Sequence, residues 1–195
     1  MRDVNSINTV TNEVLQTYSK NQDNILVLLI GACSRTGKST LSEKLSNSLN
    51  ELNQHSLIIN LDSWLIDIVK RNYTLTVMER YDTNAIVNSI NRLINGKSIS
   101  PPVYDAQRRK RIAEYSDKPI SIDSGIIIVE GLIALAIKEL INISKFSIFV
   151  EISNCMRVKR LIEFYFSLMG KYSDACVGFT DRAAGLLIPR PLAAG

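Results

Sequence analysis

The segment that most constrains the fold begins with an uninterrupted apolar run, Ile25–Ile30. The run ends where the segment GACSRTGKST begins at Gly31, and apolar residues then recur at helical spacing as far as Leu52. A short continuous apolar run is typical of a strand buried on both faces of a parallel sheet. A second apolar run, Leu57–Leu61, follows the helix. Strand, helix and strand in this order predict a right-handed βαβ unit.

The remainder of the chain continues the alternation of helices and strands. Residues 3–20 show helical spacing of apolar residues, which predicts an N-terminal helical extension over residues 1–24. Prolines around a basic cluster predict a small hairpin flap at about residues 99–122. Further elements are expected in this order: a helix at Asn84–Asn95, a strand at Ile126–Val129, a helix at Leu132–Leu140, a strand at Phe146–Ile152, a helix from Arg157 to about Leu168 and a short strand at Leu186–Ile188. The pattern predicts an α/β domain over residues 25–195, with about five parallel strands flanked by helices.

Composition and charge exclude several classes of protein. Hydrophobic residues make up 46% and charged residues 22% of the 195 residues, which excludes a disordered chain or a coiled coil. The net charge of +4 is too small for a protein that coats nucleic acid. Three cysteines and one histidine argue against a disulfide framework and a zinc site of the usual kind. No apolar stretch approaches the roughly 20 residues of a membrane span. We therefore expect a cytoplasmic protein with neither a nucleic-acid nor a membrane partner.

The segment between the first strand and helix has the composition of a phosphate-binding loop, or P-loop. Such a loop needs backbone N–H groups turned toward phosphate, a lysine for the β- and γ-phosphates and a hydroxyl for Mg²⁺. Gly37, Lys38 and Ser39 supply the last part of this pattern, whereas Ala32 replaces its first glycine. The simpler alternative is a plain turn between strand and helix. The residues expected to bind the nucleotide are Ala32, Ser34, Arg35, Thr36, Gly37, Lys38, Ser39 and Thr40. The domain is then of the P-loop NTPase type.

Two carboxylates follow later strands and are expected at the same edge of the sheet. Asp62 comes after the second strand and Glu130 after the third, and ligands of open α/β sheets bind beyond the carboxyl ends of the strands. There a carboxylate can hold Mg²⁺ or take the proton of an acceptor hydroxyl. The alternative for either residue is an ordinary surface acid or a helix N-cap.

A basic cluster opens the helix expected after the fourth strand. Arg157 and Arg160 are one turn apart there, so they could close over a triphosphate as a lid at about residues 155–172. The alternative is a solvated helix face.

In this order the motifs resemble the uridine kinase and phosphoribulokinase family of P-loop small-molecule kinases. The ordered set is more specific than the P-loop alone, which many NTPases share. Besides the P-loop, the resemblance rests on LDSW at Leu61–Trp64, RYD at Arg80–Asp82, PVYD at Pro102–Asp105, IIIVEG at Ile126–Gly131, the pair Arg157 and Arg160, and LIPR at Leu187–Arg190.

The resemblance implies transfer of the γ-phosphoryl group of ATP or GTP to a hydroxyl of a small metabolite, with a uridine- or cytidine-like nucleoside as acceptor. It implies that Asp62 deprotonates this hydroxyl and that Lys38 and Arg157 assist the transfer. It also implies a Mg²⁺ site at Ser39 and Glu130. Asp82 and Tyr104 match residues that line the nucleoside site, which the flap covers. Members are often homo-oligomers, and the resemblance leaves that state open.

Three positions depart from the family pattern. Leu65, Arg109 and Phe164 stand where the family has groups that recognise a pyrimidine. Arg109 could instead favour an anionic acceptor. Together with the short remainder of the chain after Arg190, these departures keep open a second hypothesis, a nucleotide-binding regulatory or degenerate kinase-like protein without acceptor phosphorylation.

Overall fold

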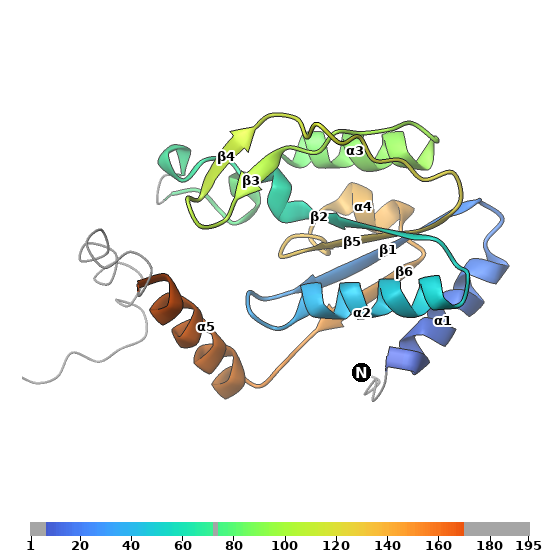
Figure 1. Cartoon of the computed structure of the whole chain (residues 1–195), viewed down its shortest axis with the longest axis horizontal. Coiled ribbons are helices and arrows are strands. Elements are labelled where there is room, and N and C mark those ends of the chain that lie inside the picture. The colour runs from blue at the N-terminus through green and yellow to red at the C-terminus, as the bar shows by residue number, and fades with distance from the viewer. Residues whose placement is uncertain (1–6, 72–73, 170–195) are drawn as a thin grey trace, which may run out of the picture. The chain divides into compact units, whose positions relative to one another are not determined.

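The computed structural model describes residues 7–71 and 74–169 (Figure 1). Two compact units divide the chain, Met1–Ile152 and Ser153–Gly195. The first unit contains the sheet and its covering helices, and the second contains the helix α5 (Asn154–Met169). No helix within the described ranges combines the length and the apolar character needed to cross a membrane.

A parallel sheet with the strand order β2-β5-β1-β6 forms the centre of the first unit. Its strands are β1 (Ile25–Ala32), β2 (Ser56–Asn60), β5 (Gly125–Gly131) and β6 (Phe146–Val150). The parallel α/β architecture is therefore confirmed, with four strands in the described part of the chain. The further strand predicted at 186–188 lies outside the described residues.

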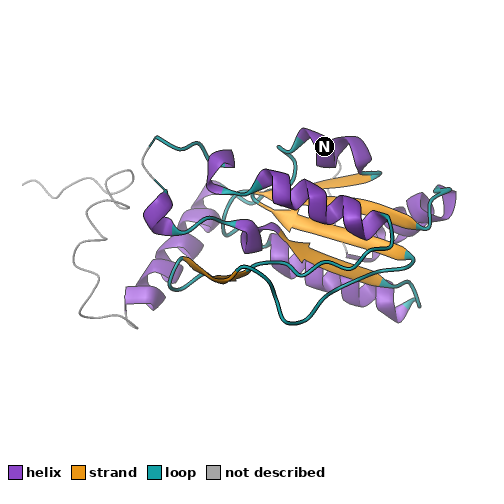
Figure 2. Cartoon of the chain, turned by 90° about the horizontal axis from the view of Figure 1, so that it is seen from above, coloured by secondary structure: helices purple, strands orange, loops and turns teal. Residues whose placement is uncertain are grey.

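Helices cover both faces of this sheet (Figures 1 and 2). The helices α1 (Ile7–Lys20) and α2 (Lys38–Glu51) pack on one face, and α3 (Thr83–Ile94) and α4 (Lys138–Ile143) pack on the other. Alternate residues of β1 contribute to the two hydrophobic cores, because successive side chains of a strand point to opposite faces. This explains why the strand reads as a continuous apolar run.

One predicted helix is wrong in position. The sequence predicts a helix at Leu132–Leu140, but residues 132–136 form turns and the helix α4 begins only at Lys138. Ile133, Ile137 and Leu140 are buried in the core on that face of the sheet. The turns bury apolar side chains at a spacing that resembles a helix, so the periodicity reports burial and not helical backbone.

The other boundaries shift by a few residues. The helix predicted from Arg157 begins earlier, at Asn154, and the strand predicted to end at Ile152 ends at Val150. The helix predicted at Asn84–Asn95 is α3, whose first turn is capped by the side chain of Asp82.

The predicted flap is present as an antiparallel hairpin outside the main sheet. It consists of β3 (Val103–Asp105) and β4 (Lys110–Ala113), and a bridge between Ile99 and Ile120 closes its base. Three short 3₁₀ helices lie between β2 and α3: η1 (Leu61–Trp64), η2 (Ile68–Lys70) and η3 (Met78–Arg80). Hydrogen bonds tie the flap to this stretch, because the N–H of Ile68 donates to the carbonyl of Arg109 and the N–H of Arg111 donates to Asp67.

Candidate functional site

The carboxyl ends of three neighbouring strands place the candidate site at one edge of the sheet. In the register of the sheet, Ile30 of β1 and Asn60 of β2 both lie opposite Glu130 of β5. The segments that follow β1 and β2 therefore begin beside Glu130. These segments are the P-loop and η1, which carries Asp62.

The P-loop closes through left-handed backbone at two positions. Arg35 has a φ of 66° and Gly37 a φ of 99°, and the buried hydroxyl of Thr36 donates to the carbonyl of Cys33 at 2.9 Å. Ala32 is the last residue of β1, in extended backbone, so the alanine in place of the first motif glycine causes no strain there. Gly31 is required for packing, because a Cβ at this position would lie 2.6 Å from Cγ of Leu135.

Ser39 and Glu130 form the part of the site that fits a divalent cation. The hydroxyl of Ser39 donates to Oε1 of Glu130 at 2.9 Å. Oε2 of Glu130 is buried and finds no hydrogen-bond partner within residues 7–71 and 74–169. Burial raises the pKa of Glu130, while the hydrogen bond from Ser39 and the charge of Lys38 oppose that rise. A hydroxyl beside a buried carboxylate oxygen without a partner suits Mg²⁺, which prefers oxygen ligands.

The described part of the chain gathers no group of three or more His, Cys, Asp or Glu side chains that could hold a metal on their own. A Mg²⁺ ion at Ser39 and Glu130 would therefore need phosphate oxygens and water to complete its ligands. This is the usual way in which proteins bind Mg²⁺ together with a nucleotide.

Two hydrogen bonds position Asp62, one through its backbone and one through its carboxylate. Its backbone N–H donates to the side chain of Asn60 at 2.8 Å, which fixes the start of η1. The hydroxyl of Tyr81 donates to Oδ1 of Asp62 at 3.0 Å. Burial, followed by the charge of Asp62, raises the pKa of Tyr81 above its usual value. Tyr81 therefore stays a neutral donor at physiological pH.

A cavity of about 180 Å³ joins the P-loop to Asp62. We call it the acceptor cavity, and it is lined by Ser34, Lys38, Asp62, Leu65, Arg71, Val77, Arg80, Tyr81 and Leu132. A larger, open groove of about 360 Å³ runs along the flap, between Ser63, Tyr104 and Lys118. The acceptor cavity is the candidate reaction site despite its smaller volume, because it contains both the P-loop lysine and the carboxylate.

The structure places several of the predicted site residues close to one another. Ser34, Lys38 and Asp62 share the acceptor cavity, and Ser39 contacts Glu130. Thr40 is exposed in the first turn of α2.

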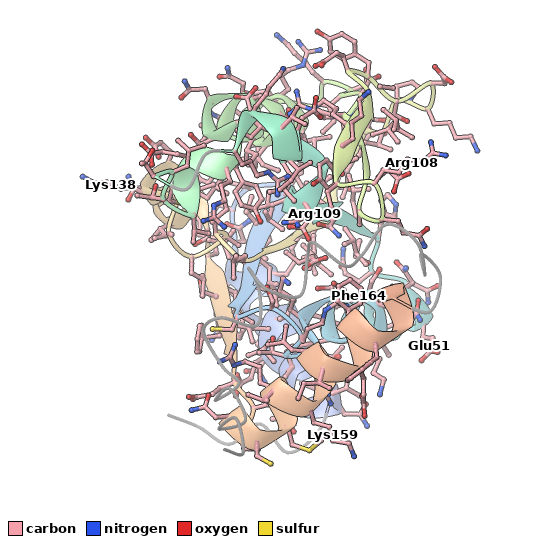
Figure 3. All side chains as sticks on the ribbon, turned by 90° about the vertical axis from the view of Figure 1, so that its left-hand side faces the viewer. Glu51, Arg108, Arg109, Lys138, Lys159 and Phe164 are labelled. Atoms are coloured by element: carbon pink, nitrogen blue, oxygen red, sulfur yellow. The ribbon has the colours of Figure 1, made fainter. Side chains whose placement is uncertain are left out.

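The residues predicted for the acceptor are more dispersed. Asp82 caps α3, where Oδ1 accepts from the N–H of Ala85 at 3.0 Å, and it is outside the lining of the acceptor cavity. Tyr104 lines the flap groove, and its hydroxyl accepts a hydrogen bond from Arg71. Figure 3 shows Arg108 at the outer edge of the flap and Arg109 nearer the body of the domain. Arg109 is half-buried with a φ of 53°.

The predicted lid arginines, Arg157 and Arg160, lie on α5 in the second unit. Within that helix Arg157 is half-buried and Arg160 is exposed. The part of the predicted lid beyond residue 169 lies outside the described residues.

Three polar residues that line the acceptor cavity are not predicted from the sequence: Arg71, Arg80 and Tyr81. The RYD motif contains two of them, but the family resemblance gives a role only to its third residue, Asp82. No local pattern marks Arg71, which reaches the cavity only because the chain turns back through η2 and η3.

Comparisons with known proteins identify the family and the fold of this chain. The model of the "Phosphoribulokinase / Uridine kinase family" matches residues 27–177. A protein named uridine kinase from Lactiplantibacillus plantarum is 28% identical over 173 residues, which cover 83% of this chain and 78% of that protein. A structure described as "a Possible Uridine Kinase from Bacillus stearothermophilus" has a TM-score of 0.64 at 22% identity, covering 87% of this chain and 90% of that one.

A second solved structure, from Silicibacter sp. TM1040, has a TM-score of 0.70 at 18% identity and covers 83% of this chain and 82% of its own. Likeness at such identity shows the fold, and the P-loop kinase fold is common to both structures. The match of the family model begins within β1 and includes the P-loop, the flap, β5 and α5. The chain therefore belongs to the phosphoribulokinase/uridine kinase family.

Proposed function

We propose that this chain is a kinase that transfers the γ-phosphoryl group of ATP or GTP to a hydroxyl group of a small metabolite. The observation that carries the proposal is the acceptor cavity, in which Lys38 of the P-loop and the carboxylate of Asp62 face the same space. Phosphoryl transfer needs an acceptor positioned in line with the phosphate and cations that stabilise the moving charge. One cavity with a phosphate-binding lysine and an oriented carboxylate meets both needs.

In the proposed reaction, the acceptor oxygen forms a bond to the γ-phosphorus while the bond from that phosphorus to the β–γ bridging oxygen breaks. The nucleoside diphosphate leaves, and the hydroxyl proton passes to Asp62. Lys38 and the N–H groups of the P-loop hold the phosphates. Ser39 and Glu130 would hold Mg²⁺, which neutralises phosphate charge when bound.

We assign the two predicted lid arginines to nucleotide binding as part of the same proposal. Arg157 and Arg160 lie one turn apart on α5, and guanidinium groups can contact phosphate oxygens with two parallel hydrogen bonds. We propose that they close over the triphosphate. We also propose that the protein is cytoplasmic, which fits its low cysteine content.

The names of the curated relatives supply the first acceptor to test. The relative from Lactiplantibacillus plantarum is named uridine kinase, so uridine and cytidine are the first candidate acceptors. In this assignment Asp82 and Tyr104 contribute to the nucleoside site.

Release of ADP in the presence of MgATP and a panel of acceptors tests the proposal. The panel contains nucleosides, sugars, sugar phosphates and hydroxy acids. We expect at least one acceptor to stimulate ADP release well above the rate with water alone. If no acceptor does so with a protein that binds nucleotide, the kinase proposal is wrong.

A second candidate function is nucleotide binding without acceptor phosphorylation. One observation favours it: Asp82, which the family resemblance places at the nucleoside, caps a helix outside the acceptor cavity. Thermal unfolding separates the two functions, since a ligand that binds only the folded state raises its stability. A regulatory protein gains stability from nucleotide alone and gains nothing further from any acceptor.

A further inference from the structure

The acceptor cavity is also lined by an arginine, Arg71, whose head group is held in place. Nε of Arg71 donates to the carbonyl of Ile66 at 2.7 Å, and Nη2 donates to the same carbonyl and to the hydroxyl of Tyr104. The guanidinium carbon also lies 5.5 Å from the ring centroid of Tyr104. These contacts fix a planar, charged group between the segment after β2 and the flap.

One donor group of this guanidinium is left over. In the described part of the chain no acid pairs with Arg71, and its Nη1 makes none of the hydrogen bonds that fix the side chain. Arg71 also lies near enough to Tyr81 for its charge to lower the pKa of that hydroxyl, against the larger effect of burial. Arg71, Tyr81 and Asp62 line the same cavity, so an acceptor held near Asp62 is close to this guanidinium.

The charges that line the acceptor cavity do not balance. Lys38, Arg71 and Arg80 face a single carboxylate, Asp62. In the proposed reaction Lys38 is used by the phosphates of the nucleotide and Asp62 by the acceptor hydroxyl. Arg71 and Arg80 then remain as two cations with no carboxylate of the cavity assigned to them.

Four acidic side chains of the flap and of the stretch from η2 to η3 make contacts with other residues. Asp105 pairs with Arg108, and Glu114 pairs with Arg111. Asp67 accepts the backbone N–H of Arg111, and Glu79 accepts hydrogen bonds from Thr76. These four acids contact other groups, and no ion pair within residues 7–71 and 74–169 joins an acid to Arg71 or Arg80.

We propose that Arg71 is a specificity-determining residue that makes the acceptor cavity select a metabolite with an anionic group, a carboxylate or a phosphate, over a neutral nucleoside. This inference rests on the proposed kinase function and names the acceptor class of the same site. The fork of a guanidinium matches the paired oxygens of both anions. The small cavity, about 180 Å³ against roughly 300–1,000 Å³ for common ligand sites, suits a compact acceptor.

Matched pairs of acceptors test the proposal. D-Ribose 5-phosphate is compared with D-ribose, and D-glycerate with glycerol, with uridine as the neutral nucleoside. The wild type should use the anionic member with a kcat/KM at least about tenfold higher, since a charge-assisted hydrogen bond is roughly twice as strong as a neutral one. A wild type that prefers uridine and the neutral members overturns the proposal while leaving the kinase function intact.

Variants of Arg71 separate its role in recognition from a role in folding. In Arg71→Gln the ratio of kcat/KM between anionic and neutral acceptors should fall at least about tenfold, mainly through KM. Arg71→Lys keeps the charge without the fork and should recover part of the ratio. Arg92→Gln, which changes an exposed arginine on α3, should leave the ratio unchanged. An unchanged ratio in Arg71→Gln would contradict the proposal.

Binding provides a readout that does not depend on turnover. Calorimetric titration with D-ribose 5-phosphate and D-ribose is done in the presence of MgADP, on the wild type and on Arg71→Gln. We expect the phosphate ester to bind the wild type and to lose at least about tenfold in affinity in the variant, with the affinity for MgADP unchanged. Equal binding of the ester to both proteins overturns the inference, whether or not any acceptor is phosphorylated. If neither the wild type nor Arg71→Gln binds MgADP, the result instead counts against the kinase function.

Discussion

The phosphate side and the acceptor side of this cavity are built in different ways. On the phosphate side, a loop joins a fully buried strand to a helix, and the side chain of Glu130 is only 2% exposed. On the acceptor side, Arg71 and Tyr104 are half-buried and come from 3₁₀ turns and a two-stranded flap. The first is positioned by core packing and strand register, and the second by hydrogen bonds between side chains and loops.

This difference teaches which part of the site can vary. Moving the P-loop would disturb the packing of β1, where even a methyl group on Gly31 would meet Leu135. Replacing Arg71 or a flap residue removes a few surface contacts and leaves the sheet intact. The family fold can thus keep its phosphate chemistry while its acceptor changes.

The largest effect is expected on the phosphate side, from Lys38→Ala. Removing the lysine leaves the developing phosphate charge without its closest cation, so turnover should fall on the order of 10³-fold or more. Steady-state ADP release with the best acceptor measures it. Lys44→Ala, a substitution of an exposed lysine on the same helix, should have little effect. Comparable losses in both variants would mean that helix α2, and not the lysine, had been damaged.

A smaller loss that separates the two sides is expected from Asp62→Asn. The amide keeps the size of the side chain but accepts no proton from the acceptor hydroxyl, so turnover should fall about 10²- to 10³-fold. Affinity for MgADP should be kept, because Asp62 lies toward the acceptor. Asp123→Asn, at an exposed position, serves as the control. If the affinity for MgADP falls as far as turnover, Asp62 acts on the phosphate side. The two sides of the cavity would then not be functionally distinct.

The sequence was sufficient to predict the phosphate side because local patterns determine it. Strand, loop and helix follow one another within Ile25–Glu51, and the apolar runs reveal which strands are central. Glu130 was predicted from its place at a strand end, and the register of the sheet places it beside β1 and β2. The misplaced helix before α4 shows the limit of periodicity, since buried turns produce the same apolar spacing.

The acceptor side could not be predicted in the same detail because it depends on how distant segments fold back. Arg71, which follows η2, donates to Tyr104 of the flap, and Tyr81, which follows η3, donates to Asp62 of η1. Nothing in the local sequence around these residues encodes the contacts. The RYD motif points to Asp82, and in the structure the side chain of Asp82 caps helix α3.

On the acceptor side, Tyr81→Phe should cost about tenfold in turnover. The phenylalanine keeps the buried ring and removes only the hydroxyl that orients Asp62, and a hydrogen bond to a charged group contributes about 1.5–3 kcal/mol. The melting temperature and nucleotide affinity should change little. Tyr115→Phe, in which the parent tyrosine is 75% exposed, is the matched control. If Tyr81→Phe retains full turnover, the orientation of Asp62 does not depend on this contact.

The smallest effect concerns stability on the phosphate side, and it depends on pH. Burial raises the pKa of Glu130 in the nucleotide-free fold, so the folded state holds a proton that the unfolded chain has already released. The contribution of the Glu130 carboxyl to stability is then fully present below about pH 4.5, the ordinary pKa of a glutamate. It is lost as the pH rises through the pKa of Glu130 in the folded state. Glu130→Gln removes the charge and should raise the free energy of unfolding at pH 7 by about 1 kcal/mol.

Urea unfolding of nucleotide-free protein across this pH range measures the difference, which should disappear as the pH approaches 4.5. Glu51→Gln, an exposed glutamate at the end of α2, should show no such trend. Adding MgATP should reverse the order, because the ionised carboxylate is the form that suits a cation. If Glu130→Gln is as stable as the wild type at every pH, burial of the ionised carboxylate does not lower the free energy of unfolding. The ionised carboxylate of Glu130 would then not destabilise the nucleotide-free fold. The phosphate side and the acceptor side would differ only in how they are packed.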